Sequence, residues 1–176
     1  MKRYKPLILS FAIIVIDQIS KTWIVNHIEE NTIGYSFFGG FLDIIHVTNN
    51  AVAFSMGQGL SLNIRAVLFI LIPIIVLAYI AKIIVSNKRP VELSNFQVWI
   101  LAGFLGGGAG NLFDRIFRHF EVVDFMSNRV YGLFGLERWP TWNFADATVV
   151  ICGILMFISI IDEEIKTKKN KEINHE

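Results

Sequence analysis

Four long apolar stretches constrain the fold of this chain more than any other feature of its sequence. They cover residues 6–25, 64–85, 96–113 and 142–161. Each holds roughly 20 residues, and a helix of that length crosses the ~30 Å hydrocarbon core of a bilayer. A chain of 176 residues that is 53% hydrophobic carries more apolar surface than a soluble domain of its size can bury. We therefore expect an all-α polytopic membrane protein with four transmembrane helices, folded as a single domain over residues 1–176.

The charged and cysteine residues argue against several classes of function. The net charge is only +1, and the charged residues form short clusters and do not line one face, which disfavours a nucleic-acid partner. One cysteine, Cys152, allows neither an internal disulfide nor a cysteine-based metal cluster. The four histidines form no H-E-x-x-H pattern, and no glycine-rich loop carries a phosphate-binding lysine. We therefore expect neither a metal nor an organic cofactor.

Basic residues predict the orientation of the spans. They form three clusters, at 2–5, 82–89 and 166–171, whereas residues 26–62 contain no lysine or arginine. Because lysine and arginine are enriched on the cytoplasmic side, we expect both termini and the turn at 86–94 to be cytoplasmic. The loops at 26–62 and 114–141 then face outward. The second of these loops contains Arg115, Arg118, Arg129 and Arg138 and runs against the rule, but the three clusters outweigh it.

The two outward loops are rich in aromatic and β-branched residues. Residues 34–48 favour a short sheet lying at the membrane surface, although single aromatic residues there could equally mark the lipid–water interface. The stretch between Asp124 and Asn143 predicts an apolar flap. The all-α fold should therefore carry a small extracytoplasmic β-rich region and a loop.

Polar residues from three of the predicted helices and one loop converge on the same layer of the membrane. They are Asp17 and Lys21 in the first helix, Asn111, Asp114 and Arg115 at the end of the third, Asp124 in the following loop, and Asn143 and Asp146 at the start of the fourth. Ionisable residues inside a span are costly, and they often mark functional sites. We therefore expect a functional site near the outer boundary of the membrane.

A pair of carboxylates offers specific chemistry at this layer. Asp146 lies one turn inside a span and needs a partner, for which Asp124 is the natural candidate. One carboxylate can deprotonate a water molecule while the other, kept protonated, polarises a carbonyl, and mutual repulsion separates their pKa values. This pattern favours an aspartic hydrolase.

Alternative interpretations of the same residues remain open at this point. Asp17 and Lys21, four residues apart on one helix face, could form an internal ion pair. Asp114 and Arg115 could be helix-end polarity at the lipid headgroups. The whole layer could instead serve a small ion or proton translocator, or hold helices together in a non-catalytic assembly subunit. A relay should be staggered across the bilayer, whereas these residues are confined to one side.

Five sequence blocks resemble the lipoprotein signal peptidases (signal peptidase II), a family of aspartic intramembrane peptidases. The blocks are D-Q-I-S-K at 17–21, N-N-A-V-A-F at 49–54, G-N-L-F-D-R at 110–115, V-V-D-F at 122–125 and W-N-F-A-D at 142–146. The third, fourth and fifth blocks in this order are highly specific. The second departs from the family pattern, because Ala51 and Val52 stand where glycine and alanine are usual.

The resemblance implies an activity and a set of site residues. It implies cleavage of diacylglyceryl-modified prolipoproteins on the amino side of the lipidated cysteine, at the outer face of a bacterial inner membrane, with inhibition by globomycin-like cyclic peptides. Asp124 and Asp146 would be catalytic, with Asn143 and Arg115 as supporting residues. The remaining polar positions that match the family are Asp17, Lys21, Asn49, Asn111 and Asp114.

Overall fold

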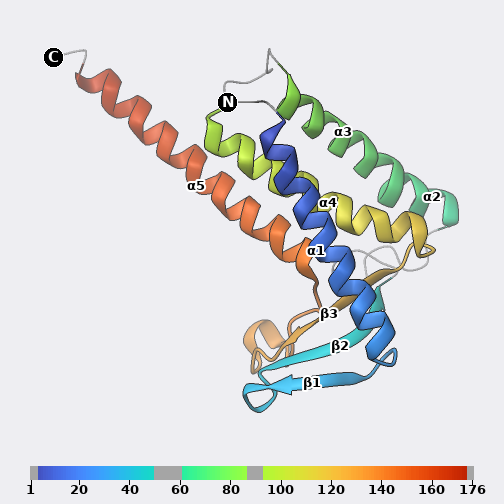
Figure 1. The fold of residues 1–176 in the computed structure, drawn as a ribbon. Coiled ribbons are helices and arrows are strands. Elements are labelled where there is room, and N and C mark those ends of the chain that lie inside the picture. The colour runs from blue at the N-terminus through green and yellow to red at the C-terminus, as the bar shows by residue number, and fades with distance from the viewer. Residues whose placement is uncertain (1–3, 50–60, 87–92, 174–176) are drawn as a thin grey trace.

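Four long helices and a small three-stranded sheet make up the protein (Figure 1). The computed structural model describes residues 4–49, 61–86 and 93–173, with side chains up to residue 168. Residues 50–54 of the second family-like block, including Ala51 and Val52, lie outside the described residues. The sheet crosses one end of the helix bundle, which we call the sheet end.

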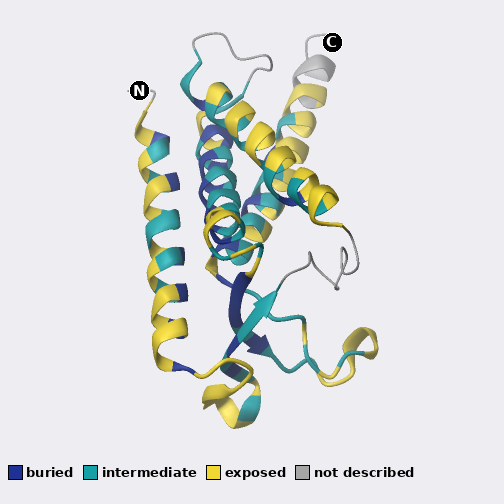
Figure 2. Ribbon diagram, turned by 90° about the vertical axis from the view of Figure 1, so that its right-hand side faces the viewer, coloured by how far each residue is buried: buried dark blue, intermediate teal, exposed yellow. Residues whose placement is uncertain are grey.

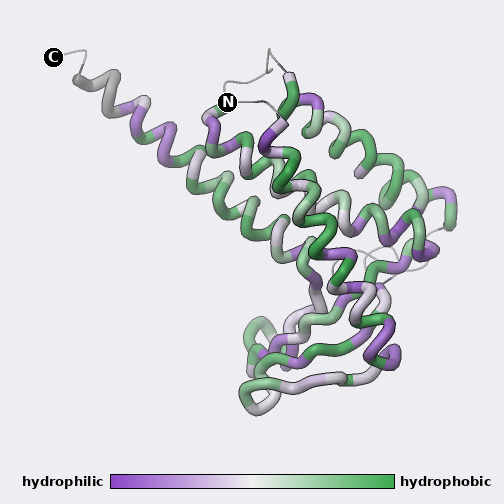
Figure 3. Tube along the Cα trace, in the orientation of Figure 1, coloured by the Kyte–Doolittle hydropathy of each residue, from purple (hydrophilic) through white to green (hydrophobic). Residues whose placement is uncertain are grey.

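The four expected spans are confirmed. They are α1 (Lys5–His27), the continuous helix made of α2 (Leu62–Ala66), a π-helical turn η3 (Val67–Leu71) and α3 (Ile72–Val85), then α4 (Asn95–Phe117) and α5 (Phe144–Ile173). Each contains a stretch long and apolar enough to cross a membrane. Apolar residues occupy the middle of the helices, and hydrophilic ones gather towards the C-terminal end of α5 and at the sheet end (Figure 3).

Both ends of the fourth helix differ from the prediction for identifiable reasons. The fourth helix begins at Phe144 instead of residue 142, because Asn143 caps it. It also continues past residue 161 to Ile173, where the ion pairs Asp162–Lys166 and Glu164–Lys168 support a charged extension by their spacing of four residues. Hydropathy marks where a helix leaves the apolar layer, but it does not mark where the helix ends.

Helix α4 is the centre of the bundle and packs against α1, α3 and α5. Its glycines allow close approach: a Cβ on Gly107 would lie 2.7 Å from the carbonyl oxygen of Ala145, and a Cβ on Gly110 would lie 2.6 Å from Asp17 Oδ2. Small residues on α4 thus permit close packing against α1 and α5. Buried residues of α1 line the side that faces the rest of the bundle, and its outward side is exposed (Figure 2).

The sheet consists of β1 (Ile33–Phe37), β2 (Leu42–Asn49) and β3 (Val122–Asn128) in the antiparallel order β1-β2-β3. The sheet expected at 34–48 is confirmed. The expectation that Asp124 lies in a loop is wrong, since Asp124 is part of β3 and pairs with Val47 of β2. Most of β3 is buried on both faces, so its sequence lacks the alternation of polar and apolar residues that signals a half-buried strand.

The segment that follows β3 is fastened to the sheet by Arg138. Its guanidinium pairs with Asp43, donates to the carbonyl oxygen of Gly40 at 3.0 Å and donates to Ser127 Oγ at 2.9 Å. Beyond this anchor lies the predicted apolar flap, where a short 3₁₀ turn, η4 (Leu133–Gly135), leaves Leu133 and Phe134 exposed. The flap therefore has a fixed base and an apolar tip.

Candidate active site

Asp124 and Asp146 approach the same point from different elements. Asp124 lies in the middle of β3, and Asp146 lies in the first turn of α5. Strand β3 is held against α1 and α4, and α4 packs along α5, so the sheet end of the bundle brings the two carboxylates together. The negative charge of Asp146 contributes to the raised pKa of Asp124, as expected for two groups that lie close together.

Three asparagines hold this carboxylate pair. Asn143 Nδ2 donates to Asp124 Oδ1 at 2.7 Å, and Asn49 Nδ2 donates to Asp124 Oδ2 at 3.1 Å. Asn111 Nδ2 donates to Asp146 Oδ1 at 2.7 Å. The amide groups of Asn143 and Asn111 also bond to each other, since Asn143 Nδ2 donates to Asn111 Oδ1 at 3.2 Å. The two carboxylates are therefore linked by a continuous amide network.

Burial and charge separate the chemical roles of the two carboxylates. Asp124 is 3% exposed. Removal from water, and secondly the negative charge of Asp146, raise the pKa of Asp124 to about 7, against the opposing effect of the hydrogen bonds from Asn49 and Asn143. A carboxyl group with such a pKa still carries its proton in a large fraction of molecules near neutrality. Asp124 can thus act as a proton donor.

Arg115 supplies positive charge beside the pair. It interacts electrostatically first with Asp124 and then with Asp146. Its guanidinium carbon lies 4.9 Å from the ring centre of Phe69. Phe69 belongs to the π-helical turn η3. A π-helical turn is uncommon and is often found at functional sites. Here it precedes Pro73, whose missing N–H removes a regular helical hydrogen bond.

The other two buried carboxylates of this layer belong to an ion network. Lys21 Nζ lies 2.9 Å from Asp17 Oδ2 and 2.9 Å from Asp114 Oδ2, and all three side chains are 0% exposed. The ion pair expected between Asp17 and Lys21 is confirmed, and Asp114 joins it. Arg118 also pairs with Asp114, with Nε 3.2 Å from Oδ1. Arg115 follows Asp114 in sequence, but it interacts electrostatically mainly with Asp124 and Asp146.

Gln18 is a site residue that sequence reasoning missed. Its Nε2 lies 3.1 Å from Asp17 Oδ2, from Asp114 Oδ1 and from the carbonyl oxygen of Gly110. Its place in the block D-Q-I-S-K was the available signal, but a neutral amide costs much less to bury than a charged group and so is a weaker indicator of function. Gln18 therefore joins α1 to α4 beside the ion network.

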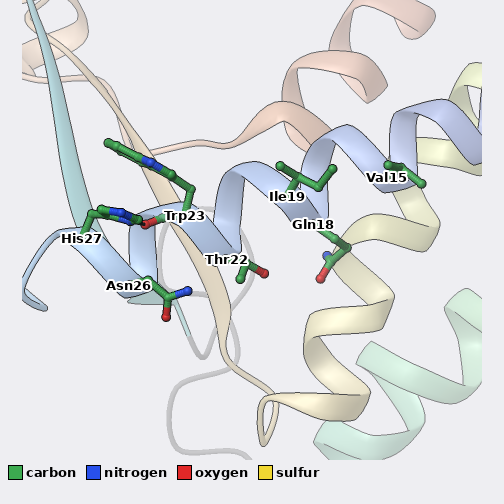
Figure 4. A pocket seen from close by; sticks show the side chains of 7 residues that line it. All are labelled: Val15, Gln18, Ile19, Thr22, Trp23, Asn26 and His27. Atoms are coloured by element: carbon green, nitrogen blue, oxygen red, sulfur yellow. Dashed lines mark hydrogen bonds between the residues drawn. The ribbon is translucent and has the colours of Figure 1, made fainter.

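A depression lies on the surface of α1, and neither Asp124 nor Asp146 is among the residues that line it (Figure 4). It is lined by Val15, Gln18, Ile19, Thr22, Trp23, Asn26 and His27. The rings of Trp23 and His27 stack there, with centres 4.7 Å apart. Gln18 lines the depression and also bonds to Asp17 and Asp114, so the depression lies next to the ion network.

Within the described part of the chain, no group of three His, Cys, Asp or Glu side chains is arranged to hold a metal ion. The chemistry that the site offers is that of two carboxyl groups, three amides and one guanidinium. Such a set can activate a water molecule and stabilise an oxyanion.

Comparisons with known proteins place the chain in a family. The family signal peptidase (SPase) II matches residues 9–162. The lipoprotein signal peptidase of Treponema denticola is 37% identical over 169 residues, covering 96% of this chain and 95% of the relative. That of Borrelia hermsii is 42% identical over 152 residues, covering 86% of each chain.

Two solved bacterial membrane enzymes share the fold. One superposes with a TM-score of 0.74 at 23% identity, covering 90% of this chain and 88% of its own. The other gives a TM-score of 0.71 at 24% identity, covering 88% of this chain and 91% of its own. The match to the family and to these relatives extends over nearly the whole chain, and it includes the helices and the strand that carry Asp124 and Asp146. This multi-pass bacterial membrane protein belongs to the signal peptidase II family of peptidases.

Proposed function

We propose that this chain is an aspartic endopeptidase that removes the signal peptide from diacylglyceryl-modified prolipoproteins, cutting on the amino side of the lipidated cysteine. The observation that carries the proposal is the bridging of Asp124 and Asp146 by Asn143, which bonds to both. The relatives named above are lipoprotein signal peptidases, which supports the substrate class. An ion or proton relay is supported less well, because the buried ionisable side chains of the described spans gather at the sheet end.

In the proposed reaction the two carboxyl groups exchange protons with water and substrate. Asp146 takes a proton from a water molecule while the water oxygen bonds to the scissile carbonyl carbon. Asp124, which carries a proton, donates it to the carbonyl oxygen as negative charge develops there. When the C–N bond breaks, Asp146 passes its proton to the leaving amine of the lipidated cysteine, and Asp124 recovers its own from the hydroxyl group. Both carboxyl groups return to their starting state.

The neighbouring residues support these steps. The positive charge of Arg115 offsets the negative charge shared by Asp124 and Asp146 as protons move. Asn49 and Asn143 fix both oxygens of Asp124, so the proton donor keeps its direction. The resulting site is held in position before substrate arrives.

The proposed orientation places the sheet end on the outer side of the membrane. The helix ends that carry Lys5, Lys82 and Lys166, the described parts of the three basic clusters, lie at the opposite end of the spans, in keeping with a cytoplasmic location (Figure 1). A lipidated substrate would then enter sideways from the outer leaflet, with its acyl chains among the lipids and its peptide bond at the carboxylates. Globomycin-like cyclic peptides would compete for the same place.

The test is cleavage of a purified prolipoprotein with and without its diacylglyceryl group. The wild-type protein should cut the lipidated form and leave the unlipidated form intact. Asp124→Asn and Asp146→Asn should each abolish cleavage, because an amide keeps the size of the carboxyl group but cannot exchange a proton in this way. Asp162→Asn, at an exposed pair on α5, is the matched control and should cleave normally. Substantial turnover by either site variant would reject the carboxylate pair.

A further inference from the structure

Lys21 is the feature of this layer that the proposed reaction leaves unused. It is fully buried within a span, and its ammonium group has three hydrogen atoms to donate. Two go to Asp17 and Asp114, each at 2.9 Å. The third goes to Asn111 Oδ1 at 2.8 Å. Charge compensation accounts for the first two contacts but not for the third, which leads out of the ion network.

The third contact determines which way the side chain of Asn111 points. An ammonium group cannot accept a hydrogen bond, so the atom of Asn111 that faces Lys21 has to be the oxygen. The NH₂ group must then lie on the other side, where it donates to Asp146 Oδ1 at 2.7 Å. Asn111 lies on α4, between Lys21 on α1 and Asp146 on α5. It therefore connects α1, α4 and α5.

The same oxygen, Asn111 Oδ1, also accepts a hydrogen bond from Asn143. The donor is Asn143 Nδ2, which lies 3.2 Å from Asn111 Oδ1 and also donates to Asp124 Oδ1 at 2.7 Å. With its oxygen held by Lys21, Asn111 presents only donors to Asp146. If the amide turned over, its oxygen would face a carboxylate oxygen, which is tolerable only when Asp146 is protonated. The direction of one amide is thus coupled to the charge of Asp146.

We propose that Lys21 is a positioning residue that locks the amide of Asn111 and thereby keeps the NH₂ group of Asn111 directed at Asp146, a role that rests on the proposed function. Lys21 acts through Asn111 and does not touch the substrate. Burial and the negative charge of Asp146 raise the pKa of Asp124, so the two carboxyl groups of the pair are not equivalent. The ion network and the carboxylate pair are then coupled through Asn111.

The test uses two variants that differ in a single property. Lys21→Met and Lys21→Gln are each made together with Asp17→Asn, so that one positive and one negative charge are removed and no buried charge is left unpaired. Methionine and glutamine have similar lengths, but glutamine can still donate to Asn111 Oδ1. We expect the methionine variant to lose roughly 10–100-fold in kcat with KM unchanged, and the glutamine variant to keep more of kcat.

Rescue by glutamine and an unchanged KM separate positioning from a structural role. A merely structural loss would lower kcat in both variants alike, because both lack the ammonium group. Equal kcat in the two folded variants, or a rise in KM in place of the fall in kcat, overturns the proposal. If the methionine variant does not fold, a folded glutamine variant with kcat more than about tenfold below wild type overturns it as well. Asp124→Asn and Asp146→Asn are measured alongside, because activity in either rejects the proposed function itself.

Discussion

Asn143 and Asp146 hold each other through two reciprocal hydrogen bonds. The backbone N–H of Asp146 donates to Asn143 Oδ1 at 2.9 Å, and the backbone N–H of Asn143 donates to Asp146 Oδ2 at 3.2 Å. This is a capping box at the first turn of α5. Because the oxygen of the Asn143 side chain is occupied by the cap, its NH₂ group is left to face Asp124. The start of one helix therefore fixes the position of one carboxylate and its link to the other.

Substitutions of Asn143 should separate these two roles. In Asn143→Ser the hydroxyl can still cap α5, but it is too short to reach Asp124. Asn143→Ala loses both contacts and should cost about 1 kcal/mol more in the free energy of unfolding. Both variants should lose cleavage rate by roughly 10–100-fold. The measurements are kcat and thermal unfolding, and a serine variant with wild-type kcat would show that the bond to Asp124 is dispensable.

The protonation of Asp124 should control the pH dependence of cleavage. Its pKa of about 7 means that the protonated form, the proton donor of the proposed reaction, is lost as pH rises through that value. We expect kcat/KM to fall on the alkaline side of about pH 7, in a limb attributable to Asp124. Asn49→Ala removes a hydrogen bond that favours the charged form, so it should move this limb to higher pH. A limb that stays in place would assign the titration to another group.

The same pKa predicts an unusual effect on stability. The folded-state pKa of about 7 lies above the ordinary value of 3.8, so the folded protein binds the extra proton between these two values. The stability that this proton contributes is complete below about pH 3.8 and is lost as pH rises through about 7. Asp124→Asn cannot ionise and should therefore melt higher than wild type well above pH 7. The difference should shrink below pH 7, and a difference independent of pH would contradict the assignment.

Sequence patterns predicted those parts of the fold that depend on local periodicity and composition. The four apolar stretches predicted the four spans. The spacing of four residues on one helix face predicted the contact between Asp17 and Lys21. Strand β3 was missed because it is buried on both faces and carries a carboxylate in its middle, so neither alternation nor hydropathy distinguished it from a loop. Its identity depends on pairing with β2, which is distant in sequence.

The candidate site could be predicted as a set of residues but not as a network. The carboxylates, Asn111 and Asn143 were predicted because they are polar in an apolar context, and Asn49 was predicted because it matches the family pattern. The division of four carboxylates into an ion network and a pair depends on which helix faces which, and close packing of glycines in α4 decides that. The anchor between Arg138 and Asp43 was also out of reach, because these residues lie far apart in the chain.

Arg138 should determine how firmly the flap is held. Its pair with Asp43 is largely buried, and its other hydrogen bonds reach Gly40 and Ser127. Arg138→Ala should therefore speed amide hydrogen exchange across residues 129–139 and lower the melting temperature, because Asp43 is left without its cation. Arg129→Ala is the matched control, since its pair with Glu137 is exposed and should contribute little. Equal exchange in both variants would mean that the flap is held by other contacts.

The last prediction concerns the side of the membrane on which the carboxylates lie. Replacing Cys152 with alanine removes the native thiol and permits single-cysteine probes. Glu137 near the flap and Lys168 on the C-terminal part of α5 are both strongly exposed, with side chains 68% and 72% accessible, so cysteines there can react freely. In intact spheroplasts an impermeant thiol reagent should label Glu137→Cys at once. It should label Lys168→Cys only after the membrane is opened.

This pattern is required by the charges and by the substrate together. The helix ends that carry Lys5, Lys82 and Lys166 all lie away from the sheet end, so an inverted protein would violate the charge rule at each of the three basic clusters. The two probes are matched in exposure, which means that a difference in labelling reports sidedness and not burial. Labelling of Lys168→Cys from outside with protection of Glu137→Cys would put Asp124 and Asp146 on the cytoplasmic side. An exported lipoprotein precursor could not reach them there, and the proposed reaction would fail with the orientation.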